Sequence, residues 1–136
     1  MTERTVPCIF SPERRRARYR RAVARQRAAD AARFVIDDMI EDIVERFDFT
    51  RAEPGSTLVV GDVTRQLAPA LQARGFDVES TGPDALDEEQ PYPRSYRYIL
   101  SLGALDTLND LPGALVHMRH ALEPGGMMIA QCLGAG

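Results

Sequence analysis

Lysine and tryptophan are absent from this chain of 136 residues, and its two cysteines, Cys8 and Cys132, lie near opposite ends. That spacing matches neither a disulfide framework nor a metal knuckle. No apolar run reaches the ~18 residues that a membrane span needs. Residues 1–11 contain no apolar segment of the kind found in secretory signals. We therefore expect a protein without a membrane span, in a reducing, cytoplasmic setting.

Charge is distributed unevenly along the chain, although the net charge is only −3. Residues 1–33 hold ten arginines and three acids, whereas residues 34–136 hold seven arginines and seventeen acids. Clustered cations bind phosphates regardless of base sequence, so the composition alone permits a nucleic-acid partner. Aromatic residues are scarce in the basic segment and the remainder is acidic. We therefore do not expect nucleic acid binding, and favour a surface helix that pairs with acidic groups of the next helix or of another subunit.

The N-terminal part, residues 1–55, is predicted to be a helical segment. Ser11 followed by Pro12 is typical of a helix start, and the Arg- and Ala-rich stretch Arg14–Arg33 favours helix. Because that stretch has few large apolar residues, we expect it on the surface. In Phe34–Phe49, apolar residues recur every three or four positions with acids between them, which predicts an amphipathic helix.

Residues 56–136 alternate between strand and helix patterns, which predicts a parallel sheet with right-handed crossovers. The expected strands are Thr57–Gly61, Phe76–Thr81, Tyr96–Leu102 and Met127–Leu133. The expected helices are Thr64–Arg74 and a segment that Asn109 caps and that runs through Leu122. The acidic, proline-containing stretch Gly82–Arg94 is expected to be a loop.

The C-terminal third carries the most specific motif. Leu122-Glu123-Pro124-Gly125-Gly126 follows the last predicted helix, and Tyr96–Leu133 as a whole resembles the central part of class I S-adenosylmethionine-dependent methyltransferases. The string Asn109–Leu115, and the order of Phe10, an Arg cluster and Phe34 before the first strand, resemble a narrower group. That group comprises the methyltransferase-like assembly factors of respiratory complex I and the carboxyl methyltransferases of biotin synthesis. The resemblance implies a reduced Rossmann-like α/β fold with strand order 2-1-4-5 in the family's numbering, and two N-terminal helices over or beside the sheet.

The resemblance also implies S-adenosylmethionine as cofactor, and no metal. The family's loop after the first strand has an acid and three glycines. Here Val59 stands at the acid, Gly61 keeps the first glycine, and Val63 and Arg65 replace the other two. A β-branched residue rarely adopts positive φ, so this loop departs from the pattern. The residues that the resemblance assigns to the cofactor are Gly61, Asp62, Thr64, Asp87, Glu88, Ser101 and Leu102.

Other positions in the same region are less specific. Gly82 stands where the family has the acid that binds the ribose hydroxyls, and Asp87 or Glu88 is the candidate for the adenine contact. Asp106 is assigned to the acceptor side, whereas Asn109 is expected to cap a helix. His117 and His120 lie three residues apart without a third metal ligand of suitable type, so a solvated helix face is the preferred interpretation.

Two function hypotheses remain open at this point. The first is a methyltransferase-family protein with an unknown acceptor. The alternative is a non-catalytic pseudo-methyltransferase that acts as a protein-binding or assembly module. The predicted last strand, Met127–Leu133, is expected at a sheet edge, and an open edge is a template for association. We therefore expect either a longer natural protein, or an edge covered by a homo-oligomeric or other protein partner or by the N-terminal helices.

Overall fold

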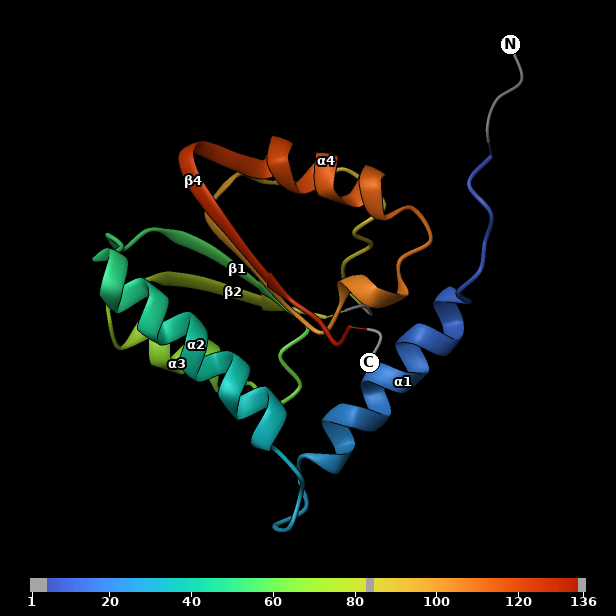
Figure 1. Ribbon diagram of the computed structural model, residues 1–136, viewed down its shortest axis with the longest axis horizontal. Coiled ribbons are helices and arrows are strands. Elements are labelled where there is room, and N and C mark those ends of the chain that lie inside the picture. The colour runs from blue at the N-terminus through green and yellow to red at the C-terminus, as the bar shows by residue number, and fades with distance from the viewer. Residues whose placement is uncertain (1–4, 83–84, 135–136) are drawn as a thin grey trace.

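The computed structural model describes residues 5–82 and 85–134, and within them the chain is an α/β protein with a four-stranded, all-parallel sheet (Figure 1). The spatial strand order is β2-β1-β3-β4. The strands are β1 (Ser56–Val60), β2 (Asp77–Thr81), β3 (Tyr96–Leu102) and β4 (Leu122–Gln131). The helices are α1 (Pro12–Arg25), α2 (Phe34–Thr50), α3 (Leu67–Gln72) and α4 (Leu111–Ala121), with a short 3₁₀ turn η1 (Leu105–Thr107). The predicted reduced Rossmann-like fold class and its strand order are confirmed.

The central strands β1 and β3 are buried on both faces, which explains their continuous apolar sequences. Successive side chains of a strand point to opposite faces. Leu58 and Val60 therefore pack in the core on the side of α4, with Met118. Val59 packs in the core on the other side, with Ile43 of α2. The sheet is thus a layer between α4 and the pair α2 and α3 (Figure 1).

Three aromatic rings fasten α2 to the sheet. The ring centroids of Phe47 and Phe76 lie 5.3 Å apart, and each lies within 5.5 Å of the Tyr98 ring. Phe47 comes from α2, Phe76 precedes β2, and Tyr98 belongs to β3. Aromatic pairs at these separations contribute about 0.5–1.5 kcal/mol each beyond the area they bury. This cluster fixes the amphipathic helix that the sequence predicts over Phe34–Phe49.

Helix α1 lies on the surface, as predicted, and none of its residues is buried. Ser11 caps it, because the Ser11 side chain accepts a hydrogen bond from the Arg14 backbone N–H. The prediction that the helix continues to Arg33 is wrong, since it ends at Arg25. The Arg33 guanidinium instead donates to the Gln26 carbonyl at 2.8 Å. Helix propensity alone does not extend a helix that no core contact stabilises.

Helix α3 is shorter than the predicted Thr64–Arg74. It begins at Leu67, so Pro69 falls in its first turn, where a missing N–H costs no helical hydrogen bond. Before it, Arg65 adopts a left-handed conformation with φ 57°. The proline therefore sets where the helix begins, and residues 61–66 are left as a loop.

Two further boundaries differ from the sequence expectations. Asp110, and not Asn109, caps α4, because the Asp110 side chain accepts from the Gly113 N–H. Strand β4 begins at Leu122, which pairs with Tyr96, and after a register shift Met127 pairs with Tyr98. The Glu123–Gly126 segment is therefore part of the strand rather than a separate connection.

Candidate functional site

A crevice opens where β1 and β3 end, next to α1. Its volume is about 200 Å³. Gly61, Val63, Leu102 and Gly103 line it from the sheet, and Arg15, Arg18 and Tyr19 line it from α1. In open α/β sheets, ligands bind outside the carboxyl ends of the strands at the point where strand order reverses. Here the chain leaves β1 for β2 on one side and later adds β3 on the other, so the crevice lies at that point.

At position 61 of the crevice, only glycine fits the backbone conformation and the space available. The φ of Gly61 is +87°, and a Cβ at this position would lie 2.3 Å from the Leu102 carbonyl oxygen. Gly61 and Leu102, both assigned to the cofactor, are therefore in contact and both line the crevice. The end of β3 passes too close to position 61 for any side chain.

Asp62 and Thr64 interact with their own loop. Asp62 is buried, and its Oδ1 accepts hydrogen bonds from the Thr64 backbone N–H at 3.0 Å and from the Thr64 hydroxyl at 2.6 Å. Its Oδ2 accepts from the Leu67 N–H at 2.9 Å, at the start of α3. Both carboxylate oxygens are thus engaged in holding the bend between β1 and α3. Neither residue lines the crevice.

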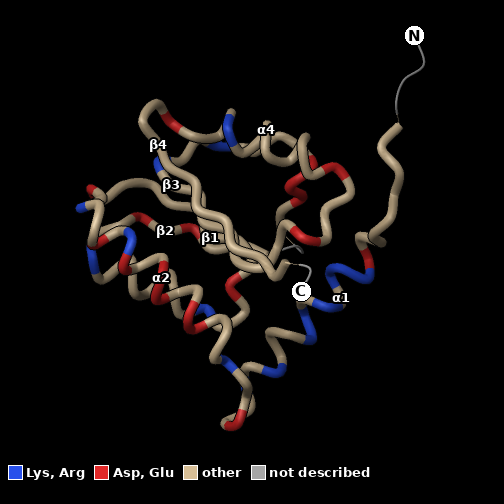
Figure 2. The backbone as a smooth tube through the Cα atoms, viewed as in Figure 1, with Lys and Arg blue, Asp and Glu red and all other residues tan. Residues whose placement is uncertain are grey.

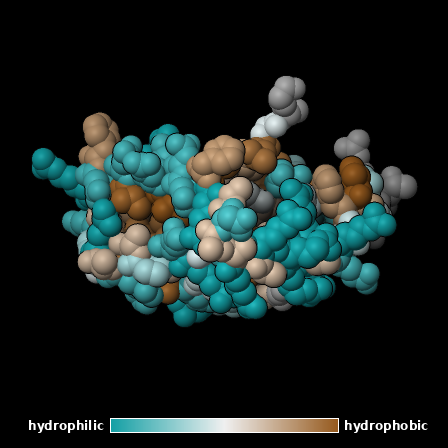
Figure 3. All heavy atoms as spheres, turned by 90° about the horizontal axis from the view of Figure 1, so that it is seen from below, coloured by the Kyte–Doolittle hydropathy of each residue, from teal (hydrophilic) through white to brown (hydrophobic). Residues whose placement is uncertain are grey.

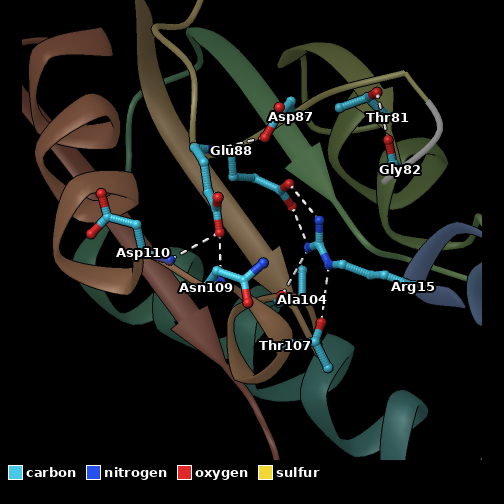
Figure 4. Close-up of polar contacts among 10 residues, drawn as sticks. Arg15, Thr81, Gly82, Asp87, Glu88, Ala104, Thr107, Asn109 and Asp110 are labelled. Atoms are coloured by element: carbon cyan, nitrogen blue, oxygen red, sulfur yellow. Dashed lines mark hydrogen bonds and ion pairs between the residues drawn. The ribbon is translucent and has the colours of Figure 1, made fainter. Parts of the chain in front are cut away.

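Glu88 is fully buried and forms the most extensive polar contact of the region, with Arg15 of α1 (Figure 4). The two terminal nitrogens of the Arg15 guanidinium, Nη1 and Nη2, each donate to one oxygen of the Glu88 carboxylate at 2.8 Å. Arg15 also donates to the Thr107 hydroxyl at 3.0 Å and to the Ala104 carbonyl at 2.9 Å. Burial lowers the pKa of Arg15, but the hydrogen bond and charge of Glu88 outweigh it, so the pKa is raised. The pair holds α1 across the carboxyl end of the sheet.

Asp87 and Glu89 brace the loop on either side of Glu88. Asp87 Oδ1 accepts from the Glu89 N–H at 3.1 Å, and Glu89 Oε1 accepts from the backbone N–H groups of Asn109 and Asp110 (Figure 4). The Asn109 side chain in turn accepts from the Ile9 N–H. Asn109 therefore links the segment before α1 to the segment before α4. Asp87 lines a separate, smaller hollow of about 70 Å³.

Tyr19 occupies the end of β2. A Cβ placed on Gly82 would lie 2.3–2.5 Å from atoms of the Tyr19 ring. Gly82 is the position at which the resembling family has its ribose-binding acid. The absence of a side chain at this position is what lets the α1 tyrosine pack there.

The two remaining assigned residues lie apart from the crevice. Ser101 of β3 is buried, and its hydroxyl has no hydrogen-bond partner among the described residues. Asp106 is exposed on η1 and lines an adjoining hollow of about 340 Å³ together with Arg18 and Val63. Of the eight assigned residues, the structure thus brings Gly61 and Leu102 into the crevice, and Asp106 beside it.

The crevice fits S-adenosylmethionine only in part. The bend at Gly61 suits close approach of a ligand to the backbone. On the opposite side, the Tyr19 ring lies against Gly82 and Arg15 holds Glu88, so groups of the chain itself fill the ribose side. About 200 Å³ is also below the ~300–1,000 Å³ typical of ligand sites. With α1 in this position, the whole cofactor does not fit.

Arg15 and Tyr19 are the functional residues that the sequence analysis missed. They lie four residues apart, so they share one face of α1. Tyr19 is the one aromatic residue within α1, and that isolated ring in an Arg-rich helix was the available signal. Both cysteines, Cys8 and Cys132, are exposed free thiols.

No family model and no curated protein matches the chain. In the described part of the chain, no group of three or more His, Cys, Asp or Glu side chains is arranged to hold a metal ion. Within residues 5–82 and 85–134, no helix has the length and apolar character to cross a bilayer. What the fold and crevice define is an α/β protein of reduced Rossmann-like type with a small crevice of about 200 Å³ at its switch point.

Proposed function

We propose that the crevice beneath α1 is the S-adenosylmethionine site of a methyltransferase-family protein whose methyl acceptor is unidentified. The observation that carries the proposal is the glycine bend at the end of β1. Gly61 touches the end of β3 at the switch point of a parallel sheet, and a hollow opens beside it. The resemblance of Tyr96–Leu133 to the methyltransferase core supports the same function.

The proposed reaction needs little acid–base catalysis by the protein. Methyl transfer is a displacement in which the protein mainly supplies proximity and orientation. Asp106 lies in the hollow that adjoins the crevice and is our candidate on the acceptor side. Since α1 fills the ribose side, binding of the cofactor requires Tyr19 to leave Gly82.

Titration calorimetry with S-adenosylhomocysteine tests this proposal. The wild-type chain should bind, and Tyr19→Ala should bind more tightly, because the ring no longer competes for the ribose side. Tyr19→Phe keeps the ring and should behave like the wild type. If no variant binds at about 1 mM ligand, where even a weak site of ~−4 kcal/mol is half filled, the cofactor function is excluded.

A second function is favoured by the way the chain fills its own crevice. Arg15 and Glu88 pair with each other and so are not available to a ligand. The Tyr19 ring packs against Gly82, where a ligand-binding side chain would otherwise stand. A non-catalytic pseudo-methyltransferase that acts as a protein-binding or assembly module would keep this arrangement permanently. Its docking surface is the outer edge of β4, because residues 125–134 carry no charge to deter pairing with another strand.

Two measurements distinguish the two functions: binding of S-adenosylhomocysteine and association of the protein through β4. A methyltransferase binds S-adenosylhomocysteine whether or not the β4 edge is covered. An assembly module binds no such ligand but associates through β4. The two exposed free thiols, Cys8 and Cys132, fit a reducing, cytoplasmic setting for either function.

A further inference from the structure

Helices α1 and α2 carry opposite charge and diverge from the loop that joins them (Figure 2). α1 has seven arginines and one acid, whereas α2 has six acids and one arginine. We infer that the two helices form an interface between two copies of this chain, in which α1 of one copy lies along α2 of the other. The interface is inferred for the chain with α1 placed as in the structure, and it goes beyond the proposed cofactor function, although Arg18 also lines the crevice.

Four charges of each helix form a stripe on one face, and the two stripes have the same length. Residues three or four apart lie on one helix face. The basic stripe consists of Arg14, Arg18, Arg21 and Arg25. The acidic stripe consists of Asp37, Glu41, Glu45 and Asp48. Each stripe spans eleven residue steps, or roughly 16 Å along the helix axis.

The chain itself leaves both stripes almost unused. The four side chains of the basic stripe are exposed and make no ion pair with any described residue. Within the same part of the chain, Asp37, Glu41 and Glu45 are exposed and also lack an ion pair, while Asp48 has an exposed contact with Arg74 at 3.3 Å. Charge complementarity is therefore available to a second molecule.

The arrangement of the two helices suits a twofold pair. α1 runs toward the connecting loop and α2 runs away from it, as two arms of a V (Figure 1). A half-turn about an axis that runs parallel to the bisector of the V, but outside the chain, places a second copy beside the first with its arms exchanged. In such a pair, α1 of one copy lies antiparallel to α2 of the other, and the same contact occurs twice, as in an isologous dimer.

The antiparallel alignment also matches the two stripes. Counted away from the connecting loop, the arginines stand 0, 4, 7 and 11 positions from Arg25, and the acids stand 0, 4, 8 and 11 positions from Asp37. Arg25 then faces Asp37 of the second copy, Arg21 faces Glu41, and Arg18 faces Glu45.

Two exposed phenylalanines extend the acidic face. Phe34 and Phe49 are 79% and 90% exposed and stand at the two ends of α2. Phe34 lies three residues before Asp37, and Phe49 four residues after Glu45, so both rings border the acidic stripe. Viewed from below, the surface is mostly hydrophilic, with hydrophobic colour in separate patches (Figure 3). In the inferred dimer these two rings lie at the two ends of the contact, where the second copy would cover them.

Sedimentation velocity of the full chain, with charge-reversal variants, tests the inference. At about 50 mM salt, where screening is weak, the wild type should be dimeric at micromolar concentrations, and at about 500 mM it should dissociate. Arg21→Glu and Glu41→Arg should each weaken the dimer at least roughly tenfold, because either change creates two like-charge pairs in a twofold dimer.

The decisive result comes from combining the two variants. An equimolar mixture of Arg21→Glu and Glu41→Arg chains should form a heterodimer, and the double variant should regain its homodimer. Arg16→Glu introduces the same charge change on another face of α1 and should leave the dimer intact. A wild type that stays monomeric at low salt overturns the inference. So does a dimer that the reversals leave unchanged, or one that the mixture does not restore.

Discussion

Glu88 is the single side chain whose removal should affect the fold most. It is fully buried, and Arg15, its ion-pair partner, is 13% exposed. Glu88→Gln leaves a buried guanidinium without its counter-charge, which typically costs about 3–5 kcal/mol. Thr107 and the Ala104 carbonyl still accept from Arg15, so we expect a loss of about 3 kcal/mol in the free energy of unfolding, measured by urea denaturation.

A paired replacement provides the control for Glu88. Arg15→Met combined with Glu88→Leu removes both charges and keeps apolar volume, and such exchanges are often neutral or stabilising. The double variant should therefore recover most of the stability that Glu88→Gln loses. Equal losses in both variants would show that the loop, and not the ion pair, is what the substitution damages.

Tyr92 should govern part of the alkaline sensitivity of the protein. Burial raises the pKa of the Tyr92 phenol above its usual range, and the charge of Glu88 adds to the effect. The unfolded chain then releases this proton at lower pH than the folded chain, so stability is intact below about pH 10 and falls as pH rises further. Tyr92→Phe should lose less stability than the wild type between about pH 9 and 11 in urea titrations.

At neutral pH the same substitution should do no harm. The Tyr92 hydroxyl is buried and has no hydrogen-bond partner among the described residues, so its removal leaves no donor or acceptor unpaired. Tyr92→Phe is expected to match or exceed the stability of the wild type near pH 7. A clear loss there would contradict the environment that the structure gives this ring.

At the scale of elements, α1 is held by few contacts and should respond to a small change beneath it. Gly82→Ala puts a methyl group within 2.5 Å of the Tyr19 ring. We expect α1 to undock more often, so that its amide hydrogens exchange roughly tenfold faster, while β1 and β3 keep their protection. The measurement is hydrogen exchange followed by mass spectrometry. If the Tyr19 ring did not pack on Gly82, the exchange rate of α1 would be the same in the variant and the wild type.

Strands β1 and β3, and helix α2, were the elements that the sequence predicted best. The runs Thr57–Gly61 and Tyr96–Leu102 are continuous and apolar because β1 and β3 are covered on both faces, and both lie within one residue of the observed bounds. Helix ends were harder to predict. The end of α1 depends on the Arg33–Gln26 contact, and the start of α3 depends on Pro69 and the Asp62 cap. Such contacts have no periodic pattern in a sequence.

The site was less predictable than the fold for the same reason. Arg15 and Glu88 are 73 residues apart, and their contact exists only because α1 crosses the carboxyl end of the sheet. The resemblance assigned Gly61 and Leu102 to the cofactor, and the structure places both residues at the crevice. The resemblance placed two N-terminal helices over or beside the sheet, but it did not indicate which α1 residues contact the crevice, Arg15 and Tyr19.

At the scale of the whole molecule, the exposed edge of β4 is a place where another chain can pair with the sheet. Ala130 is exposed near the C-terminal end of β4, within the uncharged stretch 125–134. Ala130→Lys should suppress association through the edge, since a charge there deters strand pairing, and should change stability by less than about 0.5 kcal/mol. Light scattering at about 500 mM salt, where pairing between α1 and α2 is screened, isolates this effect. Equal scattering by variant and wild type would place any association elsewhere.

The seven arginines of α1 have a consequence for proteolysis. Trypsin cleaves after arginine but needs an unwound backbone, so it can cut α1 only while the helix is released from the sheet. Where opening and closing are fast, the cleavage rate reports the population of the opened form. Any small molecule that lodges beneath α1 and stabilises its attachment should slow digestion, and one that displaces the helix should accelerate it. The rate of tryptic cleavage within α1 therefore measures how often the helix is detached from the sheet.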